Sequence, residues 1–225
     1  MIMKNLRNIL VVMTVFAVVL LGAGCTQQVA IAPSPTAQPV VQQTAPAVFE
    51  ATVIDPLKEM GPKVQFEMAD GGKMVFKLMP RYAPLTVSNF VKLVNSKFFD
   101  GLKFHRIMKT FMVQGGDGSQ DASKPVAESI YGEFASNGFP QNSISHVKGV
   151  ISMAKGGDPN SATSQFFIVT GEAKFLDGGY AAFGKLISGQ KTLDKIANTP
   201  VTANPSGEMS EPTVDVVVKT VTIIN

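Results

Sequence analysis

The alternation of apolar and polar residues becomes regular near residue 61 and predicts a β-hairpin. Val64, Phe66 and Met68 alternate with polar neighbours, and a second alternating run follows the turn Asp70-Gly71-Gly72. Successive side chains of a strand point to opposite faces, so this pattern gives each strand one buried face. The second run carries its apolar side chains at Met74, Phe76 and Leu78.

A change of period after Pro84 predicts an amphipathic helix. Apolar residues recur from Val87 to Val94 with the i, i+3, i+4, i+7 spacing that places them on one helical face. Thr86 or a residue upstream of it would cap this helix, and the pattern does not decide between them. A second short helix is predicted over residues 190–197.

Short apolar runs, most of them close to Gly or Pro, predict strands in the rest of the domain. These runs are Lys103–Ile107, Phe111–Gln114, Gly149–Ala154, Gln165–Thr170 and Ala182–Leu186. Val214, Val216 and Val218 alternate before the last apolar run, residues 221–224. About eight short strands and two helices favour a mainly β fold and a closed antiparallel barrel, although periodicity alone does not separate a barrel from a sandwich.

The first 24 residues have the composition of an export signal. Met1 to Arg7 is short and basic, and the run from Ile9 to Leu21 is apolar except for Thr14. Such a run is shorter than the ~20 residues that a membrane-spanning helix needs. The small residues Gly22-Ala23-Gly24 follow, as in a cleavage site. Residues 1–24 are therefore predicted to be a signal peptide.

Cys25, the single cysteine of the chain, stands directly after those small residues. This arrangement resembles the lipobox of bacterial lipoproteins, in which the cysteine is acylated and becomes the mature N-terminus. The resemblance departs at Gly22, where lipoboxes usually have Leu. It implies a protein that is exported and lipid-anchored to the cell membrane, facing the extracytoplasmic side. An ordinary signal peptide that leaves a free thiol and an uncleaved anchor are the alternatives.

Residues 25–60 are predicted to contain the anchor cysteine and a flexible linker. From Thr26 to Phe49 there is no charged residue, and prolines are spread among Gln, Thr, Ala and Val. A segment of this composition buries too little apolar surface to offset the entropy of folding. The folded domain is therefore expected to comprise residues 61–225.

Charge and composition exclude several classes of function. The net charge is +3, but Lys4 and Arg7 lie in the predicted signal peptide, so the remainder is close to neutral and has no basic surface for nucleic acid. One cysteine excludes an intramolecular disulfide, and with only two histidines it cannot complete a zinc site. We therefore expect no metal, no cofactor and no nucleic-acid partner.

Hydrolase and phosphate-binding motifs are missing from the sequence. It contains no Gly-x-Ser-x-Gly and no His-Glu-x-x-His, and the glycine-rich run 115–118 lacks the Lys-Ser/Thr end of a P-loop. Three aspartates next to Gly or Pro are expected to be solvated turn residues rather than acid–base catalysts: Asp117, Asp158 and Asp177.

Three ordered blocks of residues carry a resemblance to a known family. Residues 104–117 read Phe-His-Arg-x(4)-Phe-Met-x-Gln-Gly-Gly-Asp. Residues 151–154 read Ile-Ser-Met-Ala, and residues 164–168 read Ser-Gln-Phe-Phe-Ile. Residues 175–185 contain Phe-Leu-Asp-Gly-Gly-Tyr and then Phe-Gly-Lys. The order and spacing of these blocks over residues 62–224 resemble those of cyclophilins.

The resemblance implies a closed eight-stranded antiparallel β-barrel capped by two α-helices. It also implies peptidyl-prolyl cis-trans isomerase activity, which is the rotation of peptide bonds that precede proline. This rotation breaks no covalent bond, and its barrier of ~18–20 kcal/mol comes from amide resonance. The enzyme therefore needs no nucleophile, metal or cofactor, because it has only to favour the twisted amide over both planar forms.

The resemblance assigns the catalytic roles to Arg106, Phe111 and Gln114. Arg106 would hydrogen-bond to the prolyl nitrogen of the twisted amide, and Gln114 would orient Arg106 and the substrate carbonyl. Phe111 would belong to an apolar proline pocket. The implied substrate-binding residues are Met112, Ala154, Lys155, Gln165, Phe167, Phe175, Leu176 and Tyr180.

Each of these residues also has an interpretation without catalysis. Phe111, Met112 and Phe167 could simply fill the core, while Arg106 could form a surface ion pair and Gln114 could cap a turn. His105 is expected to be structural, because no partner base or nucleophile is evident. Only the joint match of the residues favours an active site.

Three positions depart from the pattern of many eukaryotic cyclophilins. This chain has Phe175 in place of Trp, Tyr180 in place of His and Lys155 in place of Asn. Loss of the indole N–H is expected to weaken the binding of cyclosporin. Lys155 is expected to shift substrate preference without removing activity.

The expected partners are proline-containing unfolded or exported polypeptides, bound by a monomer that a lipid anchor holds at a membrane. Two other functions stay open. A cyclophilin-fold module could bind or chaperone proline segments with little turnover, and a non-enzymatic surface lipoprotein would have the same signal and linker. Arg106 favours the enzyme over a pure binder, and the ordered blocks argue against the surface lipoprotein.

Overall fold

The computed structural model of the chain describes residues 61–224. The predicted signal peptide, Cys25 and the linker up to residue 60 lie outside the described residues. The structure therefore bears on the predicted folded domain. Within that part of the chain, no helix is long and apolar enough to cross a membrane.

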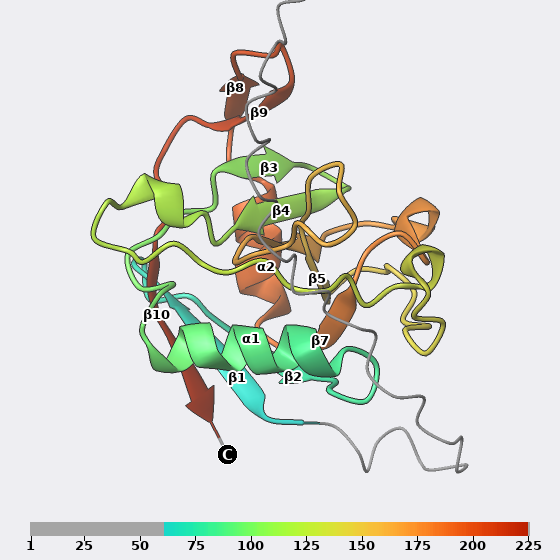
Figure 1. The fold of residues 1–225 in the computed structure, drawn as a ribbon. Coiled ribbons are helices and arrows are strands. Elements are labelled where there is room, and N and C mark those ends of the chain that lie inside the picture. The colour runs from blue at the N-terminus through green and yellow to red at the C-terminus, as the bar shows by residue number, and fades with distance from the viewer. Residues whose placement is uncertain (1–60, 225) are drawn as a thin grey trace, which may run out of the picture. The chain divides into compact units, whose positions relative to one another are not determined.

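The described residues form ten β-strands and two α-helices (Figure 1). The strands are β1 (Lys63–Met68), β2 (Lys73–Leu78), β3 (Arg106–Met108), β4 (Met112–Gly115), β5 (Val150–Met153), β6 (Phe166–Val169), β7 (Ala182–Ser188), β8 (Val201–Ala203), β9 (Met209–Pro212) and β10 (Val218–Ile224). The α-helices are α1 (Pro84–Asn95) and α2 (Gln190–Ala197). Three short 3-10 helices cover Gly118–Gln120, Ala135–Asn137 and Lys174–Leu176.

Eight of the strands form one antiparallel sheet in the order β10-β1-β2-β7-β5-β6-β4-β3. The sheet curls into a half-barrel, and its ladders do not close. β3 and β10 lie at the two edges, and the segments before them meet at an isolated bridge between Lys103 and Val217. The predicted mainly β fold with two helices is confirmed, whereas closure of the barrel is not.

The predicted hairpin and both predicted helices are confirmed. β1 and β2 bury alternate residues, and Gly71 turns the chain between them at a φ of 85°, which glycine adopts without strain. α1 begins at Pro84, whose fixed φ suits the first helical position. α1 contacts β10, and α2 contacts β2, β3 and β4.

The N-cap position of α1 is Ala83, so the upstream alternative holds and Thr86 is not the cap. The N-cap residue makes no side-chain hydrogen bond to the helix. Instead, the buried carboxylate of Glu133 accepts hydrogen bonds from the backbone N–H groups of Leu85 (2.9 Å) and Thr86 (2.8 Å). The groups that close the helix terminus are therefore supplied from far along the chain.

Two predicted strands are shifted in the structure. The run Lys103–Ile107 becomes a strand only at Arg106, where β3 begins. The alternation that starts at Val214 also overstates the last strand, because Val214 is 60% exposed and β10 begins at Val218. Residues 214–216 instead lead toward β10 as irregular backbone, and Val217 makes only the isolated bridge to Lys103.

The hairpin of β8 and β9 is an element that the apolar pattern does not predict. Its strands read Val-Thr-Ala and Met-Ser-Glu-Pro, and they are too short and polar to alternate visibly. β9 contacts β3, so residues far apart in the sequence lie side by side at this edge of the sheet (Figure 1).

Aromatic rings fill the interior of the curled sheet. The ring centroids of Phe66 and Phe166 are 5.5 Å apart, and those of Phe90 and Phe99 are 4.9 Å apart. These separations are typical of favourable aromatic pairs. The rings join β1, β6, α1 and the segment after α1 into one core.

Candidate active site

Strand register places three predicted site residues in one row across the sheet. Arg106 of β3 pairs with Gln114 of β4, which in turn pairs with Phe167 of β6. Directly paired residues of an antiparallel sheet carry their side chains on the same face. Val113 and Ile168, in the adjacent row, belong to the main core, so the row of Arg106 lies on the outer face.

The outer face of these strands carries a second, smaller apolar cluster. Its buried members are Met112, Val150, Phe167, Val169, Ala173 and Ala182. Phe111, Leu176 and Tyr180 pack against them and stay partly exposed. The cluster gives the row of Arg106 an apolar floor that does not belong to the main core.

A hollow of about 270 Å³ opens over this floor. It combines apolar side chains with two cations and one amide, which is the mixture expected of a site that binds an apolar group in a fixed orientation. Nine of the eleven predicted site residues line it: Arg106, Phe111, Met112, Gln114, Ala154, Lys155, Phe167, Leu176 and Tyr180.

The other two predicted residues lie next to the hollow. Gln165 lines an adjoining hollow of about 200 Å³ and accepts a hydrogen bond from Gln114 Nε2 (2.9 Å). Phe175 is 75% exposed, and its ring centroid is 5.4 Å from that of Phe111. Phe175 therefore packs against a lining residue from outside.

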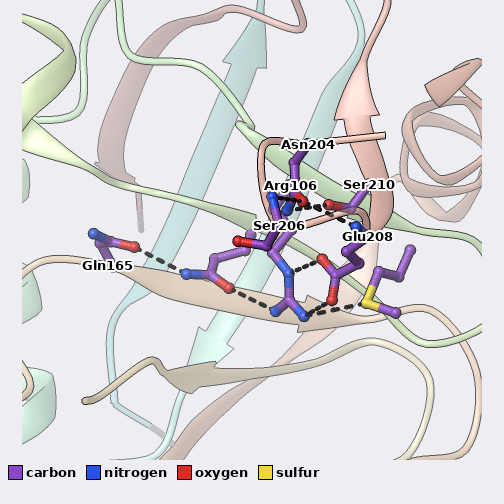
Figure 2. Close-up of polar contacts among 8 residues, drawn as sticks. Arg106, Gln165, Asn204, Ser206, Glu208 and Ser210 are labelled. Atoms are coloured by element: carbon purple, nitrogen blue, oxygen red, sulfur yellow. Dashed lines mark hydrogen bonds and ion pairs between the residues drawn. The ribbon is translucent and has the colours of Figure 1, made fainter. Parts of the chain in front are cut away.

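The guanidinium of Arg106 is held by three neighbouring side chains. Nη1 donates to Gln114 Oε1 (3.3 Å), and Nη2 donates to Met108 Sδ (3.3 Å). The third neighbour is Glu208, which accepts from Nε (2.7 Å) and from Nη2 (2.7 Å). Figure 2 shows the two carboxylate oxygens of Glu208 turned toward the guanidinium of Arg106.

Glu208 is the polar residue that sequence reasoning missed. It comes from the loop between β8 and β9, 102 residues after Arg106, and belongs to no recognisable motif. The hydrogen bond from Arg106 lowers the pKa of Glu208 to about 2, and one from Ser210 contributes. The same ion pair raises the pKa of Arg106. Both groups are therefore charged at all physiological pH values.

A chain of polar side chains, of which His146 and Ser152 are buried, lies beneath the floor of the hollow. The His146 ring stacks on Phe167, with centroids 5.9 Å apart. His146 Nε2 is 3.0 Å from Ser152 Oγ, and Nδ1 is 2.9 Å from Asp177 Oδ1. Burial lowers the pKa of His146, although Asp177 opposes this effect. The ring is therefore neutral near pH 7 and supports Phe167 from below.

This serine–histidine–aspartate chain is not a hydrolytic triad. Ser152 is fully buried in β5, so its hydroxyl cannot reach a substrate carbonyl in the hollow. Asp177 is an exposed turn residue, as predicted, and it also accepts a hydrogen bond from the backbone N–H of His146 (2.7 Å) and pairs with the His146 ring. Asp117 and Asp158 likewise lie in turns, where they accept hydrogen bonds from the backbone N–H groups of Ser119 and Asn160.

The described part of the chain has no set of side chains that could bind a metal ion. Within residues 61–224, no three His, Cys, Asp or Glu side chains gather where they could hold a metal ion. The polar groups of the hollow are instead Arg106, Lys155, Gln114 and the Tyr180 hydroxyl.

Lys155 stands between the two hollows and lines both. Its Nζ lies 5.0 Å from the centroid of the Tyr180 ring and 5.6 Å from that of Phe134. Aromatic faces attract a cation at such distances. The ammonium group is thereby fixed beside any chain segment that occupies both hollows.

The fold and the site together define a class of protein. It is a curled antiparallel β-sheet protein with two helices, whose outer face presents an apolar groove walled by a fixed arginine. The family model for cyclophilin type peptidyl-prolyl cis-trans isomerases matches residues 63–223. The chain belongs to the cyclophilin family and is a peptidyl-prolyl cis-trans isomerase.

Similar proteins carry the same activity in their names. A peptidyl-prolyl cis-trans isomerase of Acinetobacter baylyi is 37% identical over 134 residues, which cover 57% of this chain and 69% of that protein. A protein of Staphylococcus aureus (strain USA300), named as a candidate peptidyl-prolyl cis-trans isomerase, is 36% identical over 180 residues. That match covers 68% of this chain and 87% of the relative.

Solved structures agree with the fold. The crystal structure of a cyclophilin type peptidyl-prolyl cis-trans isomerase from Cryptosporidium parvum matches with a TM-score of 0.62 and 28% identity. It covers 73% of this chain and 98% of that chain. A crystal structure from the same organism, determined in the presence of the dipeptide Ala-Pro, matches with a TM-score of 0.61 and covers 72% of this chain and 99% of that chain.

Proposed function

We propose that this isomerase acts on proline-containing segments of exported polypeptides and that Arg106 stabilises the twisted amide. One observation carries the proposal: an oriented guanidinium stands at the wall of an apolar hollow lined by Phe111, Met112 and Phe167. The Cryptosporidium parvum structure determined in the presence of Ala-Pro supports a proline-containing ligand for this groove.

The proposed mechanism uses binding energy and one hydrogen bond. The proline ring packs on the apolar floor, which holds the ring while the residue before it rotates. As the amide twists, resonance is lost and the prolyl nitrogen regains a lone pair. An N–H of Arg106 donates to that nitrogen, and this bond exists only in the twisted state, so it lowers the barrier without tightening the ground state.

Gln114 has an orienting role in this mechanism. It accepts from Arg106 Nη1 and donates to Gln165, so the amide is fixed between a catalytic and a groove residue. A fixed amide and guanidinium need little reorganisation when the substrate twists, and such preorganisation is a main source of electrostatic catalysis.

The first test replaces Arg106 in the full chain, purified in detergent micelles. We expect Arg106→Ala to lower kcat/KM for an Ala-Pro peptide by roughly 10²–10³, the usual loss when one stabilising donor is removed. Exchange NMR measures the isomerisation rate, and thermal unfolding checks the fold. Arg81→Ala is the matched control, because Arg81 is exposed and does not line the hollow.

Two results would contradict this mechanism. If Arg106→Ala retained the wild-type rate, catalysis would not depend on the guanidinium. If the wild-type chain bound proline peptides but gave only the uncatalysed rate, this chain would be a proline-binding module in place of an active isomerase.

The proposal includes a lipid anchor at Cys25 and an extracytoplasmic location. The basic and apolar start of the chain, the small residues before Cys25 and the uncharged linker support it. Two or more acyl chains would hold the protein stably at a membrane, since each buried CH₂ contributes ~0.8 kcal/mol. Radioactive palmitate should label the wild-type protein and not Cys25→Ser. Equal labelling of both would rule out this anchor.

A further inference from the structure

The ion pair between Arg106 and Glu208 has a geometry that leaves one particular N–H free. An arginine side chain has five N–H donors. Nε and one hydrogen of Nη2 bind Glu208, the other hydrogen of Nη2 faces Met108 Sδ, and Nη1 donates once to Gln114. Among residues 61–224, the second Nη1 hydrogen has no partner. It is carried by the nitrogen nearest Gln114, which lines the hollow.

We infer that Glu208 is a positioning residue of the isomerase, which holds the guanidinium by its Nε–Nη2 edge so that Nη1 faces the bound proline. The inference rests on the catalytic role proposed above for Arg106. A side-on bidentate pair fixes both the position and the plane of the guanidinium, since two parallel hydrogen bonds permit little rotation. An arginine without this partner would sample several rotamers.

The loop between β8 and β9 is built to hold Glu208 in place. Asn204 Oδ1 accepts from the backbone N–H groups of Ser206 (3.0 Å) and Glu208 (3.0 Å). The Asn204 N–H donates to the Glu208 carbonyl (2.8 Å), and Gly207 turns the chain at a φ of 83°. Figure 2 shows Asn204, Ser206 and Ser210 grouped close to Glu208. The Glu208 carboxylate is therefore already ordered in the folded protein, so substrate binding does not have to order it.

Two other roles for the pair give different results on substitution. If Glu208 only tethers the hairpin to β3, its loss lowers stability and leaves the rate per folded molecule unchanged. If Glu208 competes with substrate for the arginine, its loss raises the rate. Positioning predicts a lower kcat with little change in KM, because the oriented N–H acts in the twisted state.

The test compares substitutions at Glu208 and Glu211 in the full chain in detergent micelles. We expect Glu208→Ala to lower kcat by roughly tenfold, which corresponds to about 1.4 kcal/mol of barrier. Glu208→Gln should fall between wild type and Glu208→Ala, because its amide oxygen accepts one of the two hydrogen bonds. Glu211→Ala and Glu211→Gln are the controls and should match wild type, since Glu211 is exposed on the same hairpin.

Repeating the Glu208→Ala substitution in an Arg106→Lys variant separates a positioning role from a structural one. Lysine at position 106 keeps the positive charge but lacks the planar guanidinium. Glu208 then has no pair of parallel N–H groups to hold in one orientation. Glu208→Ala should then change kcat by less than about twofold in that background, the non-additivity expected when one residue acts through another. An equal tenfold loss in both backgrounds, or an unchanged or higher rate in Glu208→Ala alone, would overturn the inference.

The outcomes also distinguish the two proposals. If Arg106→Ala loses activity while Glu208→Ala keeps the wild-type kcat, the positioning role fails and the mechanism stands. If Arg106→Ala keeps the wild-type rate, the arginine mechanism fails and the positioning role fails with it.

Discussion

The groove holds two cations whose surroundings differ. Arg106 is matched by the carboxylate of Glu208, so the pair contributes little net charge to the groove. Lys155 has no ion pair with any acidic side chain among residues 61–224 and rests against two aromatic rings. The net charge that a substrate meets between the two hollows is therefore the charge of Lys155.

Lys155 should make the enzyme favour acidic substrates. We expect kcat/KM to be about two- to fivefold higher for a peptide with Glu next to the X–Pro unit than for one with Lys, because an exposed ion pair is worth 0.2–1 kcal/mol. Lys155→Glu should reverse this order, and Lys191→Glu, on an exposed face of α2, should not. The assay should be run at low salt, because salt screens interactions between exposed charges. If the ratio of kcat/KM for the Glu peptide to that for the Lys peptide were the same in Lys155→Glu as in wild type, the predicted role of Lys155 would be wrong.

At the scale of elements, α1 depends on a residue from a distant loop. The first N–H groups of any helix lack partners within the helix. The carboxylate of Glu133 accepts hydrogen bonds from the N–H groups of Leu85 and Thr86. Its negative charge also lies at the positive end of the helix dipole. The carboxylate is fully buried, so no water replaces it when it is lost.

Substitution of Glu133 should therefore cost stability. We expect Glu133→Gln to lower the free energy of unfolding by about 1.5–3 kcal/mol, the range for hydrogen bonds to a charged group. Urea denaturation of the full chain measures the change. Glu128→Gln is the control, because the ion pair of Glu128 with Lys92 is exposed and should contribute less than about 1 kcal/mol. Equal stability of the two variants would show that this cap is dispensable.

For the molecule as a whole, the two histidines set the response to mild acid. Burial lowers the pKa of both His105 and His146, so each binds a proton more readily in the unfolded chain. Their contribution to stability is present above the unfolded pKa of about 6.5 and is lost as the pH falls below it. Burial raises the pKa of Glu133, which acts with the opposite sign, since protonation then favours the folded state.

The free energy of unfolding should consequently fall as the pH is lowered from about 7.5 to 5.5. Urea denaturation across this range measures the slope. His146→Gln should be less stable at the upper pH, because it loses contacts with Ser152 and Asp177, yet it should show a shallower slope. A slope equal to that of wild type would mean that His146 does not titrate between the two states.

Much of the fold follows from local patterns in the sequence. The hairpin of β1 and β2, both α-helices and most strands of the sheet lie where periodicity predicts them. The strands β8 and β9 do not, because they are short and polar and form through contacts with β3 instead of through a buried face of their own. Val214 misleads for a related reason: alternation is necessary for a half-buried strand, but it does not supply a pairing partner.

The sequence by itself determined the family, through three ordered blocks of residues, and with it the members of the groove that strand register brings to one face. Only the tertiary structure decided which distant residues hold Arg106, the start of α1 and His146 in place. Glu208 for Arg106, Glu133 for α1 and Asp177 for His146 are separated from their partners by 102, 47 and 31 residues. Such contacts leave no periodic or motif signal, because they depend on where the folded backbone places two segments that are distant in the sequence. The strength of a charged hydrogen bond depends on that placement, since distance, burial and direction all set its energy.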